Sequence, residues 1–361
     1  MTKKIFFTPG PSELYPTVPA YVQSALENKI GAISHRGKQF QDIYQNTVSQ
    51  LRTLLNLPAS HHILFLSSAT EIWERIMQNC VEKKSFHCVN GSFSKRFYEF
   101  AGELGRHAYK IEAEFGKGFY PDQIEVPEDA EIICLTHNET SSGVSMPVAD
   151  INKFREKNKN ALIFVDSVSS TPYPDFDFSK IDSTFFSVQK CFGLPAGLGI
   201  WIVNNSCIDK AKALLSKGNS IGTYHTLPSL MSKAEVNQTP ETPNVFSIYL
   251  LGKVCEDMNK KGAALIRKET EQKAGMIYEY LEKSGNFEIA VKEPAHRSMT
   301  TIVANTKTPA PEVNKKLEPF DMMVGTGYGS YKEKQIRIAN FPTHSIQQVE
   351  SLLQELKKSV N

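Results

Sequence analysis

The chain has 361 residues, of which 40% are hydrophobic and 22% are charged, and its 41 basic residues nearly balance 39 acidic ones. This length and composition predict a globular protein with a sizeable core and room for two domains. The near-neutral balance, without long runs of like charge, argues against nucleic acid as the main partner, and no stretch is long enough to predict a membrane span.

The cysteines and the first residues of the chain indicate the compartment. The six cysteines lie mostly in apolar surroundings and show no CxxC spacing, which is typical of reduced core cysteines. The apolar core of residues 5–7 is too short for a secretory signal. We therefore expect a cytoplasmic protein that does not bind membranes, and we expect no metal site.

Short apolar runs alternate with amphipathic runs over the first two thirds of the chain. The apolar runs predict strands at residues 62–66, 87–89, 131–135, 161–165, 184–188 and 198–203, and the amphipathic runs predict helices at residues 71–81, 94–104 and 148–157. Such alternation predicts an α/β fold with a largely parallel sheet covered by helices on both faces.

The pattern changes after the proline-rich segment 238–243. A long helical region, 245–283, is interrupted near 260–262, and it is followed by predicted strands at 287–291, 299–304 and 335–338, a helix at 311–317 and a final helix capped by Ser345. We expect a large domain over residues 16–243 and a smaller α+β domain over residues 244–361, which also includes the N-terminal segment 1–15.

Two residues at predicted strand ends carry a specific chemistry. Lys190 follows the strand 184–188 and precedes a glycine-containing turn, and Asp166 ends the strand 161–165. A lysine amine can hold an aldehyde cofactor as an imine, and a carboxylate beside a pyridine nitrogen keeps the ring protonated. An isolated lysine or aspartate is more often a solvated loop residue or a turn cap. The pair predicts pyridoxal phosphate.

Three further strand ends carry polar or small residues. Segment 66–71 opens a helix and suits an anion, although a plain N-cap would look the same. In segment 90–94, Phe93 suits ring stacking, although such aromatics more often pack in a core. Segment 137–143 clusters polar groups that also occur in ordinary turns. Because parallel strands end at one edge of a sheet, these loops predict a shared ligand site.

Motifs over nearly the whole chain resemble the class V pyridoxal-phosphate aminotransferases of fold type I, and among them the phosphoserine-using branch. These motifs are Thr8-Pro9-Gly10-Pro11, Ser34-His35-Arg36-Gly37, Asn138-Glu139-Thr140, Val165-Asp166-Ser167, Gln189-Lys190 with its following Gly-Leu-Pro-Ala-Gly-Leu, and the block from Thr242 to Tyr249. The resemblance implies a large domain with a mainly parallel seven-stranded sheet and a smaller C-terminal α+β domain. It also implies an amino acid and a keto acid as substrates.

The resemblance assigns roles to individual residues. Lys190 would form the imine with pyridoxal phosphate, Asp166 would pair with the pyridine nitrogen, Phe93 would replace the usual stacking tryptophan, Thr140 would bond the ring hydroxyl, Ala69 and Thr70 with Gln189 would hold the phosphate, and Arg337 would bind the substrate α-carboxylate. Thr242 would reach the phosphate from a second subunit, which implies a homodimer with a shared active site. Without the resemblance, Arg337 would be interpreted as a surface arginine on an edge strand.

Two departures from the family's usual sequence concern the substrate. In the best-known phosphoserine enzymes an arginine lies where this chain has Thr70, and segment 325–329 also departs from the family's usual sequence. His35 and Arg36 are candidate phosphate ligands, unless they belong to a solvated loop.

The leading hypothesis is phosphoserine:2-oxoglutarate transamination in serine biosynthesis, and Thr70 favours an alanine- or serine-using enzyme acting on glyoxylate or pyruvate. A cysteine desulfurase would need a cysteine after Cys255, which the chain lacks. A non-catalytic binding protein would not need both Lys190 and Asp166.

Overall fold

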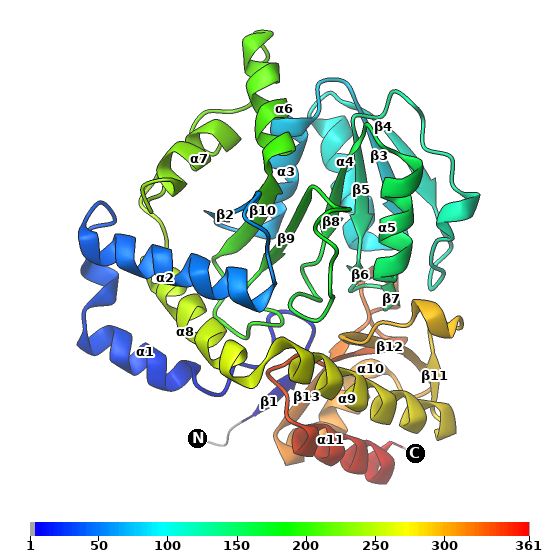
Figure 1. The fold of residues 1–361 in the computed structure, drawn as a ribbon. Helices are drawn as coiled ribbons and strands as arrows, with labels where there is room; N and C mark the ends of the chain where they lie inside the picture. Colours follow the sequence, from blue (N-terminus) through cyan, green and yellow to red (C-terminus); the bar gives the residue numbers. More distant parts are fainter. Residues whose placement is uncertain (1–3, 361) are drawn as a thin grey trace.

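The computed structural model describes residues 4–360, in which two β-sheets are surrounded by helices (Figure 1). The larger sheet has seven strands in the order β2-β10-β9-β8-β5-β3-β4. Their bounds are β2 His61–Leu66, β3 Lys84–Val89, β4 His107–Glu112, β5 Ile132–Thr136, β8 Leu162–Asp166, β9 Ser183–Ser187 and β10 Gly199–Asn204. Strand β10 runs antiparallel to both neighbours, and the other pairs are parallel. The predicted mainly parallel seven-stranded sheet is confirmed.

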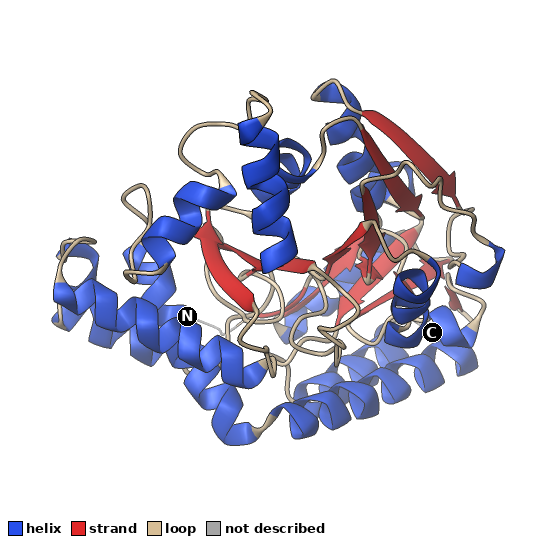
Figure 2. Ribbon diagram, turned by 45° about the horizontal axis from the view of Figure 1, so that its top comes forward, coloured by secondary structure: helices blue, strands red, loops and turns tan. Residues whose placement is uncertain are grey.

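Helices cover both faces of this sheet (Figure 2). On one face lie α3 (Ala69–Cys80), α4 (Ser92–Glu103), α6 (Asn205–Ser216) and α7 (Leu227–Ala234); on the other lie α1 (Val18–Glu27), α2 (Lys38–Leu54), α5 (Val148–Lys157) and α8 (Val245–Lys261). Strand β2 demonstrates the two-residue period: Ile63 and Phe65 join the core under α2 and α8, whereas Leu64 and Leu66 join the core under α3 and α6.

The second sheet has five strands in the order β1-β13-β14-β12-β11. Their bounds are β1 Ile5–Phe7, β11 Phe287–Ile289, β12 Thr301–Thr306, β13 Met322–Thr326 and β14 Gln335–Ala339, and helices α9 (Ala263–Lys283), α10 (Ala310–Leu317) and α11 (Ile346–Ser359) share its core. The expected cap of the last helix is present, because Ser345 forms a capping box with Gln348. A small hairpin, β6 (Asn138–Glu139) with β7 (Val144–Ser145), lies between the sheets.

Several elements differ from the sequence-based expectation. Strand β4 is an edge strand with half of its residues exposed, so its sequence is too polar to be recognised as a strand. The sequence analysis also does not predict strands β1, β6, β7 and β13 or helices α1, α2, α6 and α7. Helix α8 packs against α2 in one core (Figure 1), so the domain division after residue 243 stays a prediction. Residues 1–3 and 361 of the expected small domain lie outside the described range.

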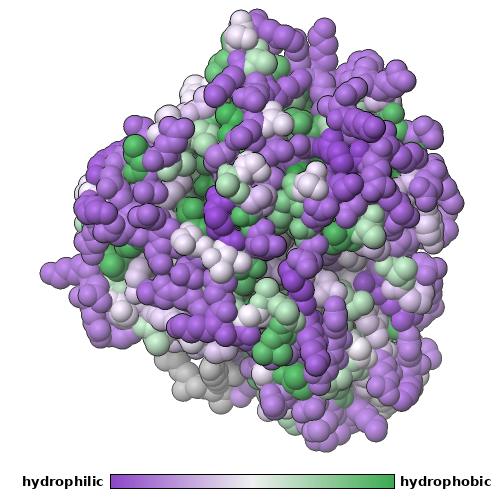
Figure 3. All heavy atoms as spheres, in the orientation of Figure 1, coloured by the Kyte–Doolittle hydropathy of each residue, from purple (hydrophilic) through white to green (hydrophobic). Residues whose placement is uncertain are grey.

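The outer surface is largely hydrophilic on the face drawn in Figure 3, with small hydrophobic patches between polar side chains. The large apolar side chains instead fill the cores between sheet and helices. Within residues 4–360, none of the helices has the length and apolar character needed to cross a bilayer.

Candidate active site

A cavity of about 230 Å³ lies where β5, β8 and β9 end and where α3 begins. Seven of the residues singled out in the sequence line it: Ala69, Thr70, Phe93, Thr140, Asp166, Gln189 and Lys190. Gly10 and Pro11 of the N-terminal segment complete one side. The expectation that the strand-end loops meet at one edge of the sheet is therefore confirmed.

Lys190 is buried in this cavity, with 9% of its surface exposed. Its Nζ donates a hydrogen bond to the carbonyl oxygen of Pro9 at 2.8 Å and lies 5.5 Å from the ring centroid of Phe93. A Cβ at Gly10 would come within 2.7 Å of Lys190 Cε, so glycine leaves the room this side chain needs. Burial lowers the pKa of Lys190 to about 8, and the charge of Arg337 acts in the same direction.

Asp166 ends β8 and is 4% exposed. Its Oδ1 accepts a hydrogen bond from the backbone N–H of Val168 at 3.0 Å, and its Oδ2 accepts one from Trp73 Nε1 at 3.1 Å. Burial raises the pKa of Asp166 to about 7, although both donors act in the opposite direction. A cation placed beside this carboxylate would favour its ionised form.

Trp73 is a site residue that sequence reasoning missed. It lies on the inward face of α3, where it stacks on Phe97 with ring centroids 5.6 Å apart, so its pattern is that of a core residue. Its indole N–H still needs an acceptor when buried, and Asp166 provides it. One signal was available in the sequence: Trp73 lies one turn beyond the polar loop that opens α3.

The start of α3 forms an anion cradle. Ser68 caps the helix by accepting a hydrogen bond from the N–H of Glu71 at 3.1 Å, and the N–H of Ala69 donates to Ser187 Oγ at 2.9 Å. A Cβ at Gly199 of β10 would lie 2.5 Å from the backbone carbon of Ser68, so the loop packs directly on the sheet. Helix N-termini attract anions. The buried Oε1 of Gln189 finds no hydrogen-bond partner among residues 4–360.

The polar segment after β5 is organised by short hydrogen bonds. Thr140 Oγ1 and Asn138 Nδ2 both donate to Ser169 Oγ at 2.7 Å. Glu139, fully buried, accepts hydrogen bonds from Ser94 N at 2.8 Å and from Ser141 Oγ at 2.7 Å, and it thereby fixes the start of α4. Ser169, to which the sequence analysis gives no role, thus holds Thr140 at the cavity wall.

Arg337 extends from β14 towards the cavity. Ile336 and Ile338 are fully buried on the opposite side, as their alternation predicted. The guanidinium donates to the carbonyl oxygens of Thr326 at 2.7 Å and Thr140 at 3.5 Å, and it lies 5.6 Å from the ring of Tyr328. Arg337 therefore borders the site from the second sheet without lining the cavity itself.

Besides Arg337, three predicted residues do not line the cavity of their own chain: His35, Arg36 and Thr242. Arg36 donates to Gln238 Oε1 at 3.0 Å and to the backbone carbonyls of Thr239 at 2.6 Å and Pro240 at 2.9 Å. Thr242 is exposed and His35 is half-exposed. Residues 4–360 contain no group of three or more side chains placed to hold a metal ion.

Residues 5–332 of the chain match the protein family described as "Aminotransferase class-V". The chain belongs to the class-V aminotransferases. A phosphoserine aminotransferase of Rhodococcus opacus is 27% identical over 353 residues, which cover 96% of this chain and 92% of that protein.

Solved structures of aminotransferases are also similar to this chain. The crystal structure of a phosphoserine aminotransferase from Cytophaga hutchinsonii matches with a TM-score of 0.99 and 68% identity, covering 100% of both chains. A subgroup IV aspartate aminotransferase from Thermus thermophilus, 20% identical with a TM-score of 0.87 over 99% of both chains, shares the fold.

The chemistry of the cavity suits this aminotransferase. Lys190 supplies an amine whose lowered pKa leaves part of it uncharged near neutral pH. Asp166 supplies a buried carboxylate, the start of α3 supplies N–H groups for an anion, and Phe93 supplies a flat apolar wall. Together these groups fit an aromatic, phosphate-bearing aldehyde.

Proposed function

We propose that this enzyme is a phosphoserine:2-oxoglutarate aminotransferase of serine biosynthesis that uses pyridoxal phosphate. The observation that carries the proposal is the 68% identity, over the full length of both chains, to a phosphoserine aminotransferase. When bound, the cofactor supplies a cationic ring that makes the α-proton of an amino acid acidic. The residues of the cavity are then responsible for binding, orientation and proton transfer.

Each residue of the cavity takes the role that its chemistry permits. The backbone groups of Ala69 and Thr70 with the Gln189 side chain would hold the phosphate, Phe93 would lie against the ring, Thr140 would bond the ring hydroxyl, Asp166 would pair with the pyridine nitrogen and Lys190 would bind the aldehyde. Trp73 fixes the orientation of Asp166. As a free amine, Lys190 Nζ would be the base that removes the α-proton of the substrate, and burial favours its uncharged form by lowering its pKa.

The active enzyme is a homodimer in which the partner's Thr242 reaches the cofactor phosphate. The exposure of Thr242 and its absence from the cavity of its own chain support this assignment. His35 and Arg36 are assigned to the substrate phosphate at the same interface. The Arg36 guanidinium already donates hydrogen bonds to segment 238–240, so it attracts the substrate phosphate through its positive charge.

The enzyme is placed in the cytoplasm and acts only on small molecules, without nucleic acid or membrane as a partner. All six cysteines are free and buried, as expected in a reducing compartment. The chain is divided into a large domain, 16–243, and a small domain formed by 244–361 with 1–15. The pairing of β1 with β13 supports the assignment of the N-terminal segment to the small domain.

A half-reaction screen tests the substrate. The purified enzyme is mixed with phosphoserine, serine, alanine or glutamate, and the cofactor absorbance is followed. Each charge-assisted hydrogen bond to a substrate phosphate contributes about 1.5–3 kcal/mol, so we expect phosphoserine to exceed serine and alanine by at least about tenfold in kcat/KM. Equal values would favour the alanine- or serine-using alternative, for which Thr70 is the specific support. A protein that binds no cofactor would favour a non-catalytic role.

Arg337→Lys tests the carboxylate site. Lysine keeps the charge but loses the paired donors, so we expect KM for both the amino donor and the keto acceptor to rise by about 10- to 100-fold. Cofactor retention should not change. Arg267→Lys is the matched control, because Arg267 bonds Tyr173 and Asp175 outside the cavity. Unchanged KM values in Arg337→Lys would remove Arg337 from this role.

A further inference from the structure

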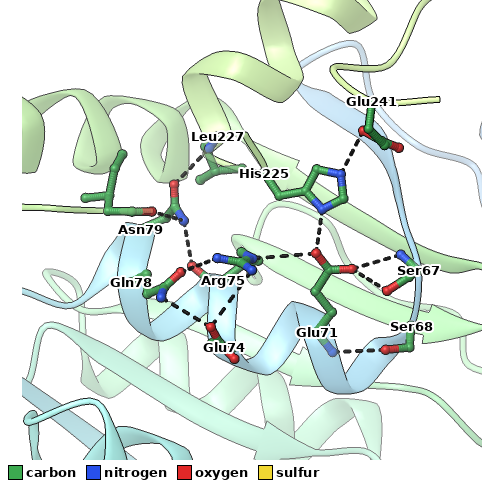
Figure 4. Close-up of polar contacts among 11 residues, drawn as sticks. Ser67, Ser68, Glu71, Glu74, Arg75, Gln78, Asn79, His225, Leu227 and Glu241 are labelled. Atoms are coloured by element: carbon green, nitrogen blue, oxygen red, sulfur yellow. Dashed lines mark hydrogen bonds and ion pairs between the residues drawn. The ribbon is translucent and has the colours of Figure 1, made fainter. Parts of the chain in front are cut away.

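A buried histidine lies between two carboxylates beside the phosphate cradle (Figure 4). His225 is 3% exposed; its Nδ1 is 2.5 Å from Glu71 Oε1 and its Nε2 is 2.8 Å from Glu241 Oε2. A carboxylate oxygen accepts hydrogen bonds and does not donate them. Both ring nitrogens must therefore carry protons, and His225 is an imidazolium in this arrangement.

The electrostatic balance agrees with this geometry. Burial lowers the pKa of His225, but the hydrogen bonds to Glu241 and Glu71 outweigh it and raise the pKa to about 9. Burial raises the pKa of Glu71, but its bonds to His225 and Ser67 outweigh this effect and lower it to about 2. Arg75 also faces Glu71, with Nε at 3.6 Å, and the Tyr224 ring lies 4.1 Å from the His225 ring. The folded state thus favours the protonated ring.

Glu71 ties this network to the phosphate cradle. It lies in the first turn of α3, next to Thr70, and its Oε2 accepts hydrogen bonds from both the N–H and the hydroxyl of Ser67, at 3.0 and 2.5 Å. Glu71 therefore holds the loop that precedes α3 against the helix. Asn79, further along α3, accepts a hydrogen bond from Leu227 N at 2.8 Å and so anchors the segment that carries His225 (Figure 4).

Glu241 ties the same histidine to the segment that carries Thr242. That segment is fixed from two sides: Arg36 bonds residues 238–240, and His225 bonds Glu241. Thr239 Oγ1 also donates to the carbonyl oxygen of Glu241 at 2.8 Å. Because Thr242 is itself exposed and adjacent to Glu241, the position of Glu241 sets where Thr242 is presented.

We propose that protonated His225 is a positioning residue that locks the phosphate cradle and the Thr242 segment to each other, and thereby makes cofactor-phosphate binding depend on pH. This inference rests on the proposed function. When His225 loses a proton, one ring lone pair faces a carboxylate, and the attraction there becomes repulsion. Because its folded-state pKa of about 9 exceeds the ordinary 6.5, the stabilisation is complete below pH 6.5 and is lost as pH rises through about 9.

The test uses pyridoxamine phosphate, which has no aldehyde and cannot join Lys190 covalently. Its dissociation constant from the full-length apoenzyme is measured by equilibrium dialysis between pH 6.5 and 10.5, beside pyridoxamine, which lacks the phosphate. We expect the affinity for pyridoxamine phosphate to fall about tenfold or more through pH 9, since charge-assisted hydrogen bonds are lost, while pyridoxamine shows no such step.

Three variants locate the effect. His225→Gln should bind pyridoxamine phosphate about tenfold more weakly at pH 7.5 and show no step near pH 9. Glu241→Gln removes one carboxylate and should move the step to lower pH. His62→Gln is the matched control, because His62 is a half-exposed histidine bonded to Asn205 outside the network, and it should behave as the unchanged protein does.

A step that persists in His225→Gln, or that pyridoxamine shows equally, would overturn the inference and leave the proposed function intact. If His225→Gln does not fold, the inference is still tested by the pH dependence of pyridoxamine phosphate binding in Glu241→Gln and in the unchanged protein. An unchanged protein that binds neither pyridoxamine phosphate nor pyridoxal phosphate would overturn the proposed function together with the inference.

Discussion

Lys190→Ala is expected to reduce transamination by at least about 10⁴-fold, because it removes both the attachment point of the cofactor and the base for the α-proton. The protein should remain folded, because within residues 4–360 the Lys190 side chain makes a single hydrogen bond, to Pro9, and burial lowers its pKa, so its charged form is disfavoured in the folded state. Steady-state rates and thermal melting measure the two effects. Substantial residual transamination would show that the assignment of Lys190 is wrong.

Lys273 is an internal control for this assignment. It is 1% exposed, it donates to the carbonyl oxygens of Phe341 and His344 at 2.9 and 2.8 Å, and burial also lowers its pKa to about 8. A buried lysine with a lowered pKa is therefore not unique to Lys190. Borohydride trapping of the cofactor followed by peptide mass mapping should label Lys190 and not Lys273, since only Lys190 lines the cavity. A label on Lys273 would contradict the site.

Asp166→Ala is expected to lower kcat roughly a thousandfold or more, equivalent to about 4 kcal/mol in the barrier. Without the carboxylate, nothing holds the proton on the pyridine nitrogen, and the ring no longer withdraws electrons from the α-carbon. The apoenzyme should remain folded at pH 8. The variant leaves the N–H groups of Trp73 and Val168 without their acceptor, but it also removes a buried carboxylate that is ionised there because its pKa is raised to about 7, and the two effects oppose each other. Near-normal kcat in the folded variant would exclude Asp166 from this role.

Two companion variants separate orientation and burial from chemistry. Trp73→Phe keeps the ring packing but removes the hydrogen bond to Asp166 Oδ2, so kcat should fall by about tenfold. Asp182→Ala removes another buried carboxylate, which pairs with Arg155 and accepts a hydrogen bond from the N–H of Ile163 at 2.7 Å. Asp182 directly precedes β9 and does not line the cavity, so the variant should have a lower melting temperature and an unchanged kcat in the folded enzyme.

Much of the large sheet could be predicted because its strands are short apolar runs bounded by polar turns. The predicted helix at residues 148–157 coincides with α5, and the interrupted helix at 245–283 is α8 followed by α9. One of the missed elements has a clear physical cause. Strand β4 is an edge strand that pairs only with β3, and none of its side chains is fully buried, so its sequence lacks a strong apolar pattern.

The sequence by itself determined the α/β architecture and seven of the residues that line the cavity. The periodicity of apolar residues is a local property, so it predicts strands directly from the sequence. Because parallel strands end at the same edge of a sheet, a residue that follows such a strand can be placed at that edge. The tertiary structure alone decided which side chains meet. Trp73 reaches Asp166 across 93 positions, Pro9 reaches Lys190 across 181, and His225 reaches Glu71 across 154. Such contacts depend on how whole elements pack, and no local pattern in the chain encodes that packing.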